Sequence, residues 1–477
     1  MKPLCSSVII LTLLAAGCGR PAKDIGVLRQ KTLPEVHNNL VIGCETLDRD
    51  YADYHAYKEY LEPLGMRHVR LQAGWAKCEP KRGQYDFSWL DSIIDDAVSR
   101  GLEPWLELSY GNPVYPGGGT PFLSGGWPRG QEALAGWKAW VREVAVRYKG
   151  KVHQWEIWNE PENNLRREGR DPAEMADLTF ETARMLKEID PEAIVAAYGI
   201  GRPRHANGVA ELIALLSEKL HASGQEYLID AVSYHGYHYI PEEPYFMEAD
   251  SLKSILTKYN WDVPIWQGES GAPSVGYMGG AIADYPWTEV SQAKWALRKI
   301  LCDHAHGIRT GIFSIADMNY ASTDEINKKN YKGLLSTDEN NRVLRPKMAY
   351  EAVRNLVSVY DNLSVACDSS AVKVYADSAM VYLFLDEVTG LNSAVIWRAG
   401  AAPTDKCDKT PVKVAIEGFC GRKPVCVDLL TGHVYRPRVR CCSGTTILKN
   451  VPFFDSPVII CDESQVSMAT ASAGLVE

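Results

Sequence analysis

The sequence predicts an α/β protein, a TIM (β/α)8 barrel followed by an antiparallel β-sandwich. Strand-like and helix-like patterns alternate eight times within residues 39–358, which favours a barrel over an open doubly wound sheet. No Gly-x-Gly-x-x-Gly motif follows the first strand, although a dinucleotide-binding sheet would carry one there. From residue 359 the helical periodicity gives way to short alternating stretches between Gly, Pro, Asp and Asn, which is typical of a sandwich.

The expected barrel strands are short apolar runs bounded by turn residues. They cover 40–44, 68–73, 104–109, 152–158, 193–198, 229–234, 264–268 and 310–316. Amphipathic helices are expected between them; within 134–148, for example, Trp137, Val141 and Val144 share one helical face. The expected sandwich strands cover 372–375, 380–385, 393–397, 412–416 and 457–460, in a domain of residues 359–465 that is followed by a disordered tail, 466–477.

Residues 1–17 are predicted to be a targeting segment. Lys2 is its only positive charge, and the apolar stretch 8–16 is too short to span a bilayer. Residues 14–18, Leu-Ala-Ala-Gly-Cys, resemble a bacterial lipoprotein cleavage box, which implies lipidation of Cys18 and a place in the cell envelope, on the outer membrane, facing the periplasm or the surface. Ala15 stands where the box usually has Leu, so secretion without an anchor is the alternative. Residues 18–38 then form a linker, in which 33–36 is a candidate strand for the sandwich.

The composition limits the classes of molecule that the protein is expected to bind. The net charge is −9 and no Lys/Arg-rich run occurs, so neither nucleic acid nor an anionic membrane surface is expected to bind. Thirteen Trp and 24 Tyr against nine Phe favour surfaces that combine a flat apolar face with a hydrogen-bonding edge, as sugar sites do. The twelve cysteines do not have zinc-site spacing and no His-Glu-x-x-His motif occurs, so we expect no catalytic metal and no cofactor. Neither the disulfide pairing nor the oligomeric state follows from the sequence.

Two glutamates point to chemistry because each ends an expected buried strand. Residues 155–162 read Trp-Glu-Ile-Trp-Asn-Glu-Pro-Glu, where Pro161 removes a backbone donor and helps stop the strand after Glu160. Residues 263–270 read Val-Pro-Ile-Trp-Gln-Gly-Glu-Ser and place Glu269 at a second strand end. Either one alone is explained by an ordinary turn or a salt-bridged carboxylate. Together they are what glycoside hydrolysis requires, one carboxyl as acid and base and one as nucleophile.

These motifs resemble those of glycoside hydrolase clan A, retaining barrel enzymes whose acid/base follows an Asn at the end of strand four and whose nucleophile ends strand seven. The resemblance is closest to family 39, which includes β-xylosidases and α-L-iduronidases. It implies Glu160 as acid/base after Asn159, Glu269 as nucleophile, His235 and Tyr237 beside the sugar, and Arg70 as the charge that favours ionised Glu269. At the end of the seventh strand, residues 267–270 differ from the Thr-Glu motif that is usual in family 39. At the eighth strand, residues 313–317 occupy the place where the clan often has a Trp.

Loop residues supply further candidates for sugar binding. A long glycine-rich and aromatic-rich segment follows the third expected strand, with Tyr110 and Asn112 at its start. Trp75 and Trp287 lie just beyond strand two and beyond the glycine-rich loop after strand seven, where indoles can stack on sugar rings. Packing in the core is the alternative for each of them.

The resulting expectation is a retaining hydrolase of β-linked glycosides that works by double displacement. An exo-acting, β-xylosidase-like enzyme is favoured, with an endo-acting β-glucanase or xylanase as the first alternative. A catalytically inactive, carbohydrate-binding lipoprotein is the second, although both glutamates are present. A metal-dependent deacetylase would need clustered ligands, which only His235 and His238 approach.

Overall fold

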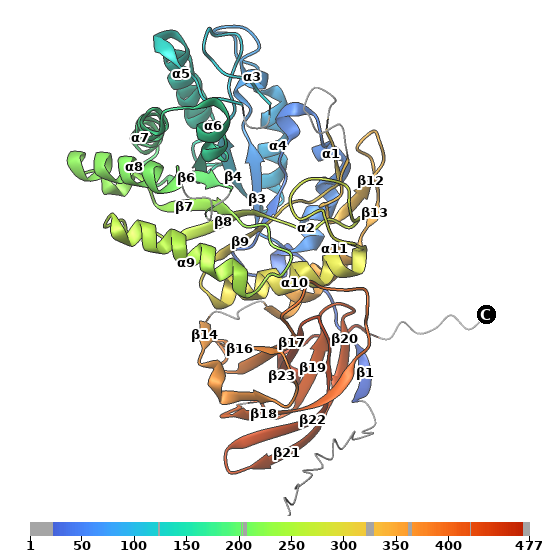
Figure 1. The fold of residues 1–477 in the computed structure, drawn as a ribbon. Coiled ribbons are helices and arrows are strands. Elements are labelled where there is room, and N and C mark those ends of the chain that lie inside the picture. Colours follow the sequence, from blue (N-terminus) through green and yellow to red (C-terminus); the bar gives the residue numbers. More distant parts are fainter. Residues whose placement is uncertain are drawn as a thin grey trace, which may run out of the picture.

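The computed structural model describes residues 22–470, except 123–124, 202, 204–207, 321–328, 361–364 and 420. The expected targeting segment, Cys18 and residues 471–477 of the expected tail lie outside the described residues. Residues 466–470, also expected to be disordered, are ordered, because Met468 forms a β-bridge with Leu28 and the Ala469 amide donates to the carbonyl of Val27 at 2.8 Å. A barrel and its helices form one part of the molecule, and a smaller sandwich lies against one side of it (Figure 1). None of the described helices combines the length and apolar character needed to cross a membrane.

Eight parallel strands close into the expected barrel, and Val41 completes the ring by pairing with His68 on one side and Gly311 on the other. The strands, in order around the barrel, are β2 (Val41–Gly43), β3 (His68–Gln72), β4 (Glu103–Leu108), β5 (Gln154–Ile157), β6 (Ile194–Ile200), β7 (Ala231–His235), β8 (Ile265–Ser270) and β9 (Arg309–Ile312). Every strand falls on a segment that the apolar runs predicted.

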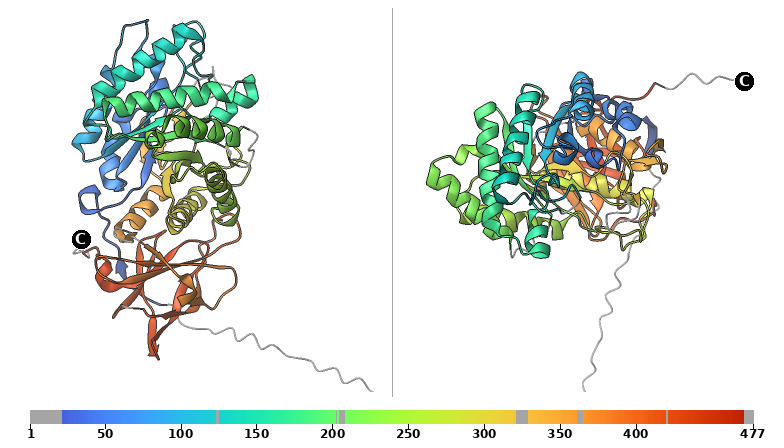
Figure 2. Two further views of the ribbon diagram at one scale, coloured as in Figure 1. Left: turned by 90° about the vertical axis from the view of Figure 1, so that its left-hand side faces the viewer. Right: turned by 90° about the horizontal axis from the view of Figure 1, so that it is seen from above.

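The helices surround the barrel (Figure 2). The long ones are α4 (Ser88–Ser99), α5 (Gly130–Tyr148), α7 (Pro172–Ile189), α8 (Val209–Ser223), α9 (Glu243–Lys258), α10 (Glu289–Ala305) and α11 (Met348–Tyr360), and the short ones are α1 (Tyr54–Tyr57), α2 (Leu61–Leu64), α3 (Trp75–Cys78) and α6 (Pro161–Glu168). Helix α5 buries Trp137, Val141 and Val144, the face that its periodicity predicted.

The barrel interior changes from apolar to charged along the strands. Val41, Trp105, Ala196 and Ala231 form an apolar layer with Trp266. Because side chains two residues apart on a strand share a face, the next interior position after Trp105 is Glu107. Arg70 and Glu156 enter the same space by the same alternation, two residues after His68 and Gln154. The charged layer therefore lies toward the carboxyl ends of the strands, where active sites of such barrels are built.

The sandwich has a seven-stranded sheet in the order β1-β20-β19-β23-β17-β16-β14 and a four-stranded sheet in the order β15-β18-β22-β21. Their bounds are β1 (Lys23–Val27), β14 (Val365–Cys367), β15 (Val372–Val374), β16 (Ala379–Leu385), β17 (Asn392–Arg398), β18 (Thr410–Glu417), β19 (Pro424–Asp428), β20 (His433–Arg436), β21 (Arg438–Cys442), β22 (Thr445–Phe453) and β23 (Val458–Asp462).

Residues before the barrel do join the sandwich, but not at the predicted place. Strand β1 pairs antiparallel with β20. The predicted segment 33–36 instead begins a 3-10 helix, Leu33–Glu35, whose Thr32 and Glu35 form a reciprocal capping box and whose Pro34 suits the first helical turn.

Buried ion pairs join the sandwich to the barrel through α10. The Nζ atom of Lys294 lies 2.6 Å from Asp455, and Arg298 pairs with Glu242 at 2.6 Å. The indole of Trp397 donates to the same Glu242 carboxylate at 2.7 Å. Because α10 lies between two packed surfaces, nearly all of its side chains are buried, including polar ones.

Candidate active site

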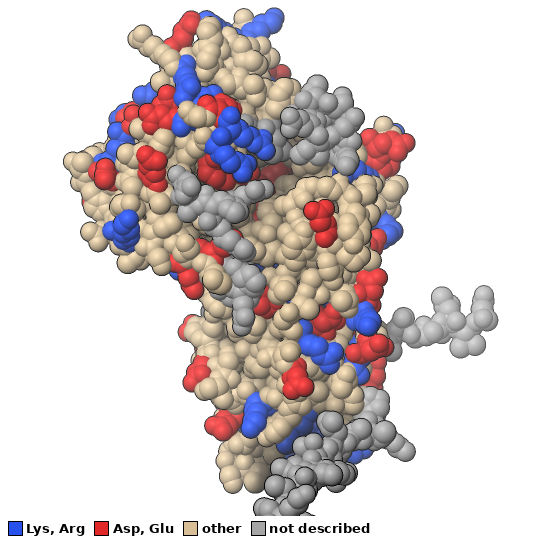
Figure 3. Space-filling view, in the orientation of Figure 1, with Lys and Arg blue, Asp and Glu red and all other residues tan. Residues whose placement is uncertain are grey.

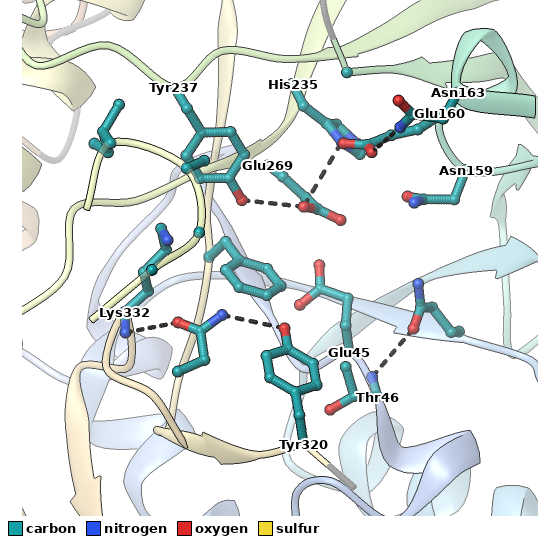
Figure 4. A pocket seen from close by; sticks show the side chains of 18 of the residues that line it. Glu45, Thr46, Asn159, Glu160, Asn163, His235, Tyr237, Glu269, Tyr320 and Lys332 are labelled. Carbon is teal, nitrogen blue, oxygen red and sulfur yellow. Dashed lines mark hydrogen bonds and ion pairs between the residues drawn. The ribbon is translucent and has the colours of Figure 1, made fainter. Parts of the chain in front are cut away.

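A cavity of about 660 Å³ opens at the carboxyl ends of the barrel strands. Figure 3 shows red carboxylate side chains inside a hollow on this face and blue basic side chains at its edge. Figure 4 shows Glu160 and Glu269 in the same cavity, with His235 between them. The lining residues on which the site's chemistry depends are Glu45, Arg49, Gln72, Tyr110, Asn159, Glu160, Asn163, His235, Tyr237, Glu269, Tyr320 and Lys332.

The backbone directs Glu160 into this cavity. Glu160 follows β5 and is the N-cap residue of α6, with Pro161 in the first helical turn and a left-handed φ of 48°. Its amide donates to the carbonyl of Gly199 at 2.8 Å, which fixes the turn against β6. Its carboxylate accepts a hydrogen bond of 2.6 Å from Asn163 Nδ2. Glu160 therefore lies at a strand end, as expected, and its position is also fixed because α6 begins directly after it.

Glu269 is ionised because three groups hold its carboxylate. Arg70 Nη1 donates to its Oε1 at 2.8 Å, and the Tyr237 hydroxyl donates to its Oε2 at 3.1 Å. Burial would raise the pKa of Glu269, but the positive charges of His235 and Arg70 and these hydrogen bonds outweigh burial and hold the pKa below its usual range. An ionised carboxylate is the form that a nucleophile needs.

His235 links the two carboxyl groups. Its Nδ1 lies 3.0 Å from Glu160 Oε1 and 3.6 Å from Glu269 Oε2. Burial alone would lower the pKa of His235, but the negative charge of Glu269 and the hydrogen bond to Glu160 raise it to about 9. The raised pKa favours the doubly protonated ring at neutral pH, in which both nitrogens are donors. One ligand atom from each of the three residues lies within 4.8 Å of the others, so the two carboxyl groups face each other closely.

Arg70 is the centre of a buried charge cluster beneath Glu269. Its guanidinium contacts Glu45 at 2.9 Å and Glu156 at 2.7 Å, and it also pairs with Glu107. Burial raises the pKa of Glu45 to about 8 and that of Glu107 to about 7, although the charge of Arg70 opposes both shifts. The raised pKa values favour the neutral form of both glutamates, and a neutral Glu45 or Glu107 leaves more of the field of Arg70 acting on Glu269.

Three of the predicted sugar contacts lie elsewhere. Trp75 is buried between Tyr115 and Trp140, and its indole donates to Glu79 at 2.7 Å. Asn112 uses its side chain to hold the loop, because its amide donates to the carbonyl of Glu79 at 2.9 Å and its oxygen accepts from a backbone amide.

Trp287 also packs away from the cavity. Its indole donates to the carbonyl of Ile282 at 2.6 Å, and its ring packs with Tyr285, so it supports the loop after β8 without lining the cavity. Asn159 and Tyr110 do line the cavity, and Asn159 Oδ1 accepts from Arg70 at 3.4 Å.

Several residues of the site escaped the sequence analysis. Glu45 follows the first barrel strand just as Glu160 follows the fourth, so the same strand-end signal was present in residues 41–46. Glu107 and Glu156 are charged residues inside apolar strands, which is itself a sign of a buried polar cluster. Asn163 and Lys332 carry no comparable signal, because their positions depend on how α6 and the loop after β9 fold back.

The chain is similar to known glycoside hydrolases in parts of its sequence. A family model described as Glyco_hydro_42, beta-galactosidase, matches residues 52–112. A β-1,4-xylanase of Dictyoglomus thermophilum is 26% identical over 230 residues, 44% of this chain and 60% of the xylanase. A 6-phospho-β-glucosidase of Clostridium longisporum is 27% identical over 157 residues, 30% of this chain and 31% of the relative. The chain spans less than two thirds of the length of these relatives.

Solved structures share the whole architecture. A family 39 glycoside hydrolase from Bacteroides cellulosilyticus WH2 has a TM-score of 0.62 at 16% identity, covering 90% of this chain and 81% of its own. A monomeric β-xylosidase from Caulobacter crescentus CB15 has a TM-score of 0.58 at 15% identity, with coverages of 92% and 97%. The resemblance to clan A is thus confirmed, and the fold is that of family 39: a TIM barrel with a β-sandwich.

Proposed function

We propose that this protein is a retaining glycosidase that hydrolyses β-linked glycosides by double displacement. The observation that carries the proposal is the pair Glu160 and Glu269, which line one cavity and bring a carboxyl oxygen each to within 4.8 Å of the other. Retaining enzymes hold their two carboxyl groups about 5–5.5 Å apart, whereas inverting enzymes leave roughly 6.5–9.5 Å for a water molecule. An approach within 4.8 Å leaves no room for a water molecule between the two carboxyl groups, which supports retention.

The two steps assign one role to each carboxyl. In the first step, ionised Glu269 attacks the anomeric carbon while Glu160 gives its proton to the departing glycosidic oxygen, so that a glycosyl ester forms on Glu269 and an alcohol leaves. In the second step, Glu160 takes a proton from water, the resulting hydroxide attacks the anomeric carbon, and the ester bond to Glu269 breaks. Both inversions together give net retention, and Glu160 ends protonated as it began.

The favoured mode is exo, in which one terminal sugar is removed at a time, as a β-xylosidase does. A volume of about 660 Å³ lies within the roughly 300–1,000 Å³ of pockets that enclose small ligands. Residues 278–282 of the loop after β8 line one side of it. The similarity to a β-1,4-xylanase over 230 residues is the observation in favour of the endo alternative.

A substrate panel tests the proposal. The protein would be produced from residue 18 with Cys18→Ser and offered aryl β-glycosides as well as plant and microbial polysaccharides, beside Glu160→Ala and Glu269→Ala. We expect one aryl glycoside to be cleaved, with monosaccharide as the product, and both variants to lose activity. Oligosaccharide products would favour endo action, and activity that survives both substitutions would refute the site. Carbohydrate binding without any cleavage would instead favour the inactive alternative.

We also propose lipid attachment at Cys18 and a place on the outer membrane. Strand β1 begins at Lys23 and pairs within the sandwich, so an anchor at Cys18 would leave the molecule from the sandwich, away from the cavity at the barrel mouth (Figure 1). Mass spectrometry of the N-terminal peptide from bacterial membranes tests this, with Cys18→Ser expected to release the protein into the soluble fraction.

A further inference from the structure

Lys332 is a buried lysine without a counter-ion in the part of the chain that the structure describes. Its side chain is 5% exposed and lines the cavity of Glu269. Three other described lysines, Lys294, Lys299 and Lys347, are equally buried, and each of them pairs with an aspartate. Lys332 makes neither an ion pair nor a side-chain hydrogen bond with a described residue. Because a buried charge destabilises a protein unless it is paired, this lysine differs from the other three in needing a partner.

The position of Lys332 is fixed by its backbone. The Lys332 amide donates to Asn330 Oδ1 at 3.0 Å, and its carbonyl accepts from Gln292 at 3.2 Å. The side chain then runs past Gly280 toward Tyr237, and the ammonium lies 5.5 Å from the centre of that ring. Tyr237 is the residue that donates to Glu269, so the ammonium lies on the nucleophile side of the cavity.

Glu269 does not serve as the counter-ion. Its carboxylate already accepts hydrogen bonds from Arg70 and Tyr237, and it forms no ion pair with Lys332. Burial lowers the pKa of Lys332 to about 8, and the charge of Glu269 opposes this shift without cancelling it. The ammonium is still the main form at neutral pH and faces an open cavity.

We infer that Lys332 binds an anionic group of the substrate, a carboxylate on the exocyclic carbon of the sugar attacked by Glu269, so that the preferred substrate is a β-hexuronide. This inference rests on the proposed glycosidase function. A pyranose ring has the 2-hydroxyl on one side of its anomeric carbon and, beyond the ring oxygen, the exocyclic group on the other. Figure 4 shows Asn159 and Lys332 on opposite sides of Glu269. With Asn159 in contact with the 2-hydroxyl on one side of the anomeric carbon, Lys332 contacts the exocyclic group on the other side.

Charge matching selects a carboxylate among the anionic groups. One ammonium balances one negative charge, as a carboxylate carries, whereas a phosphate at the same carbon carries nearly two at neutral pH. A neutral xyloside, which lacks the exocyclic carbon, would leave Lys332 buried and unpaired in the complex. The hexuronide is therefore the substrate that completes this side of the cavity.

Matched aryl glycosides test the inference. The values of kcat/KM would be compared for p-nitrophenyl β-D-glucuronide and β-D-glucoside, for the galacturonide and galactoside, and for the 6-phosphoglucoside and the xyloside. We expect a uronide to exceed its neutral partner. In Lys332→Met the ratio of uronide to neutral substrate should fall about 100-fold, because truncating one partner of a buried charge pair costs several kcal/mol. The readout is the ratio of the two kcat/KM values, in which a loss common to both substrates cancels.

Lys329→Met is the matched control. Lys329 belongs to the same segment after β9 and lines the same cavity, but its ammonium donates to the carbonyl of Thr337. Its substitution removes the same charge and should leave the ratio unchanged. The melting temperature of Lys332→Met should equal or exceed that of the parent protein, because the substitution removes an unpaired buried ammonium. A lower melting temperature would show that Lys332 is paired and would overturn the inference.

The remaining outcomes separate this inference from the proposed function. Faster cleavage of neutral glycosides than of uronides would overturn the inference and leave the glycosidase intact, and a preference for the 6-phosphoglucoside would overturn the assignment of a carboxylate. If no glycoside is cleaved, the proposed function fails. Saturation-transfer NMR with D-glucuronate and D-glucose then decides: binding of glucuronate that requires Lys332 supports the anion site, and its absence overturns it.

Discussion

Arg70 and Glu269 are joined by a buried hydrogen bond of 2.8 Å, and the same guanidinium also contacts Glu45, Glu107 and Glu156. One cation is thus shared by four carboxyl groups in the interior of the barrel. Arg70 holds the nucleophile in place. It also stabilises the charged layer of the barrel interior, toward the carboxyl ends of the strands. Its removal is expected to affect activity and folding together.

Arg70→Met should lower the free energy of unfolding by roughly 3–5 kcal/mol, because removal of one partner leaves buried carboxylates uncompensated. Urea denaturation of the parent and the variant would measure the difference. Arg147→Met is the control, since Arg147 pairs with Asp91 at the surface and is half exposed, and exposed pairs contribute about 0–1 kcal/mol. Equal losses in the two variants would contradict the role of Arg70.

Stability should also depend on the charge of His235. The pKa of His235 rises from an ordinary value of 6.5 to about 9 on folding, so the folded state binds its proton more tightly than the unfolded state. Its contribution is complete below pH 6.5 and disappears as the pH rises through 9. The difference in unfolding free energy between the parent and His235→Gln should therefore shrink between pH 6.5 and 9. A difference that stays constant would show that His235 is neutral in the folded protein.

Tyr237→Phe should move the acid limb of kcat/KM to higher pH. The limb reports protonation of Glu269 in the free enzyme, and the hydroxyl of Tyr237 favours the ionised form of that carboxylate. In the parent the midpoint should lie below the ordinary glutamate value of 4.5, because the pKa of Glu269 is lowered. Tyr285→Phe, which removes a hydroxyl bonded to the carbonyl of Pro403, should leave the limb in place.

Gly201→Ala should reduce kcat without unfolding the protein. A Cβ atom at residue 201 would lie 2.6 Å from the Glu160 carboxyl carbon, so the acid/base would have to shift. A displacement of about 1 Å in an active site can cost roughly 100-fold in rate. Initial rates at saturating substrate, together with a thermal melt, would measure this effect. An unchanged kcat in a folded variant would mean that the position of Glu160 is not critical.

Much of the fold was predictable because short apolar runs and turn residues are local signals. All eight barrel strands lie on their predicted segments, and Glu160 and Glu269 were found because each closes such a run. The sandwich was harder to predict. Strand β1 joins its sheet by pairing of Lys23 with Arg436, more than 400 residues away in the sequence, and no local pattern encodes that pairing.

The side chains in the loops were the hardest to place. Trp75 and Trp287 carry indoles of the kind that stack on sugar rings, yet both are buried in the protein. Their indole N–H groups donate to the side chain of Glu79 and to the carbonyl of Ile282. Lys332 was missed for the converse reason, since a lysine in a polar loop looks exposed until its burial is known. Which face a loop residue presents depends on tertiary packing that a single sequence does not contain.

The central claim is that Glu269 forms a covalent glycosyl ester with the sugar during the reaction. The most direct test is to incubate the protein with the 2-deoxy-2-fluoroglycosyl fluoride of the sugar that the panel identifies, and to map the labelled peptide by mass spectrometry. The account predicts one sugar per chain, attached to Glu269, with labelling retained but slowed in Glu160→Ala. A label on another residue, or continued turnover with no trapped intermediate, would contradict it.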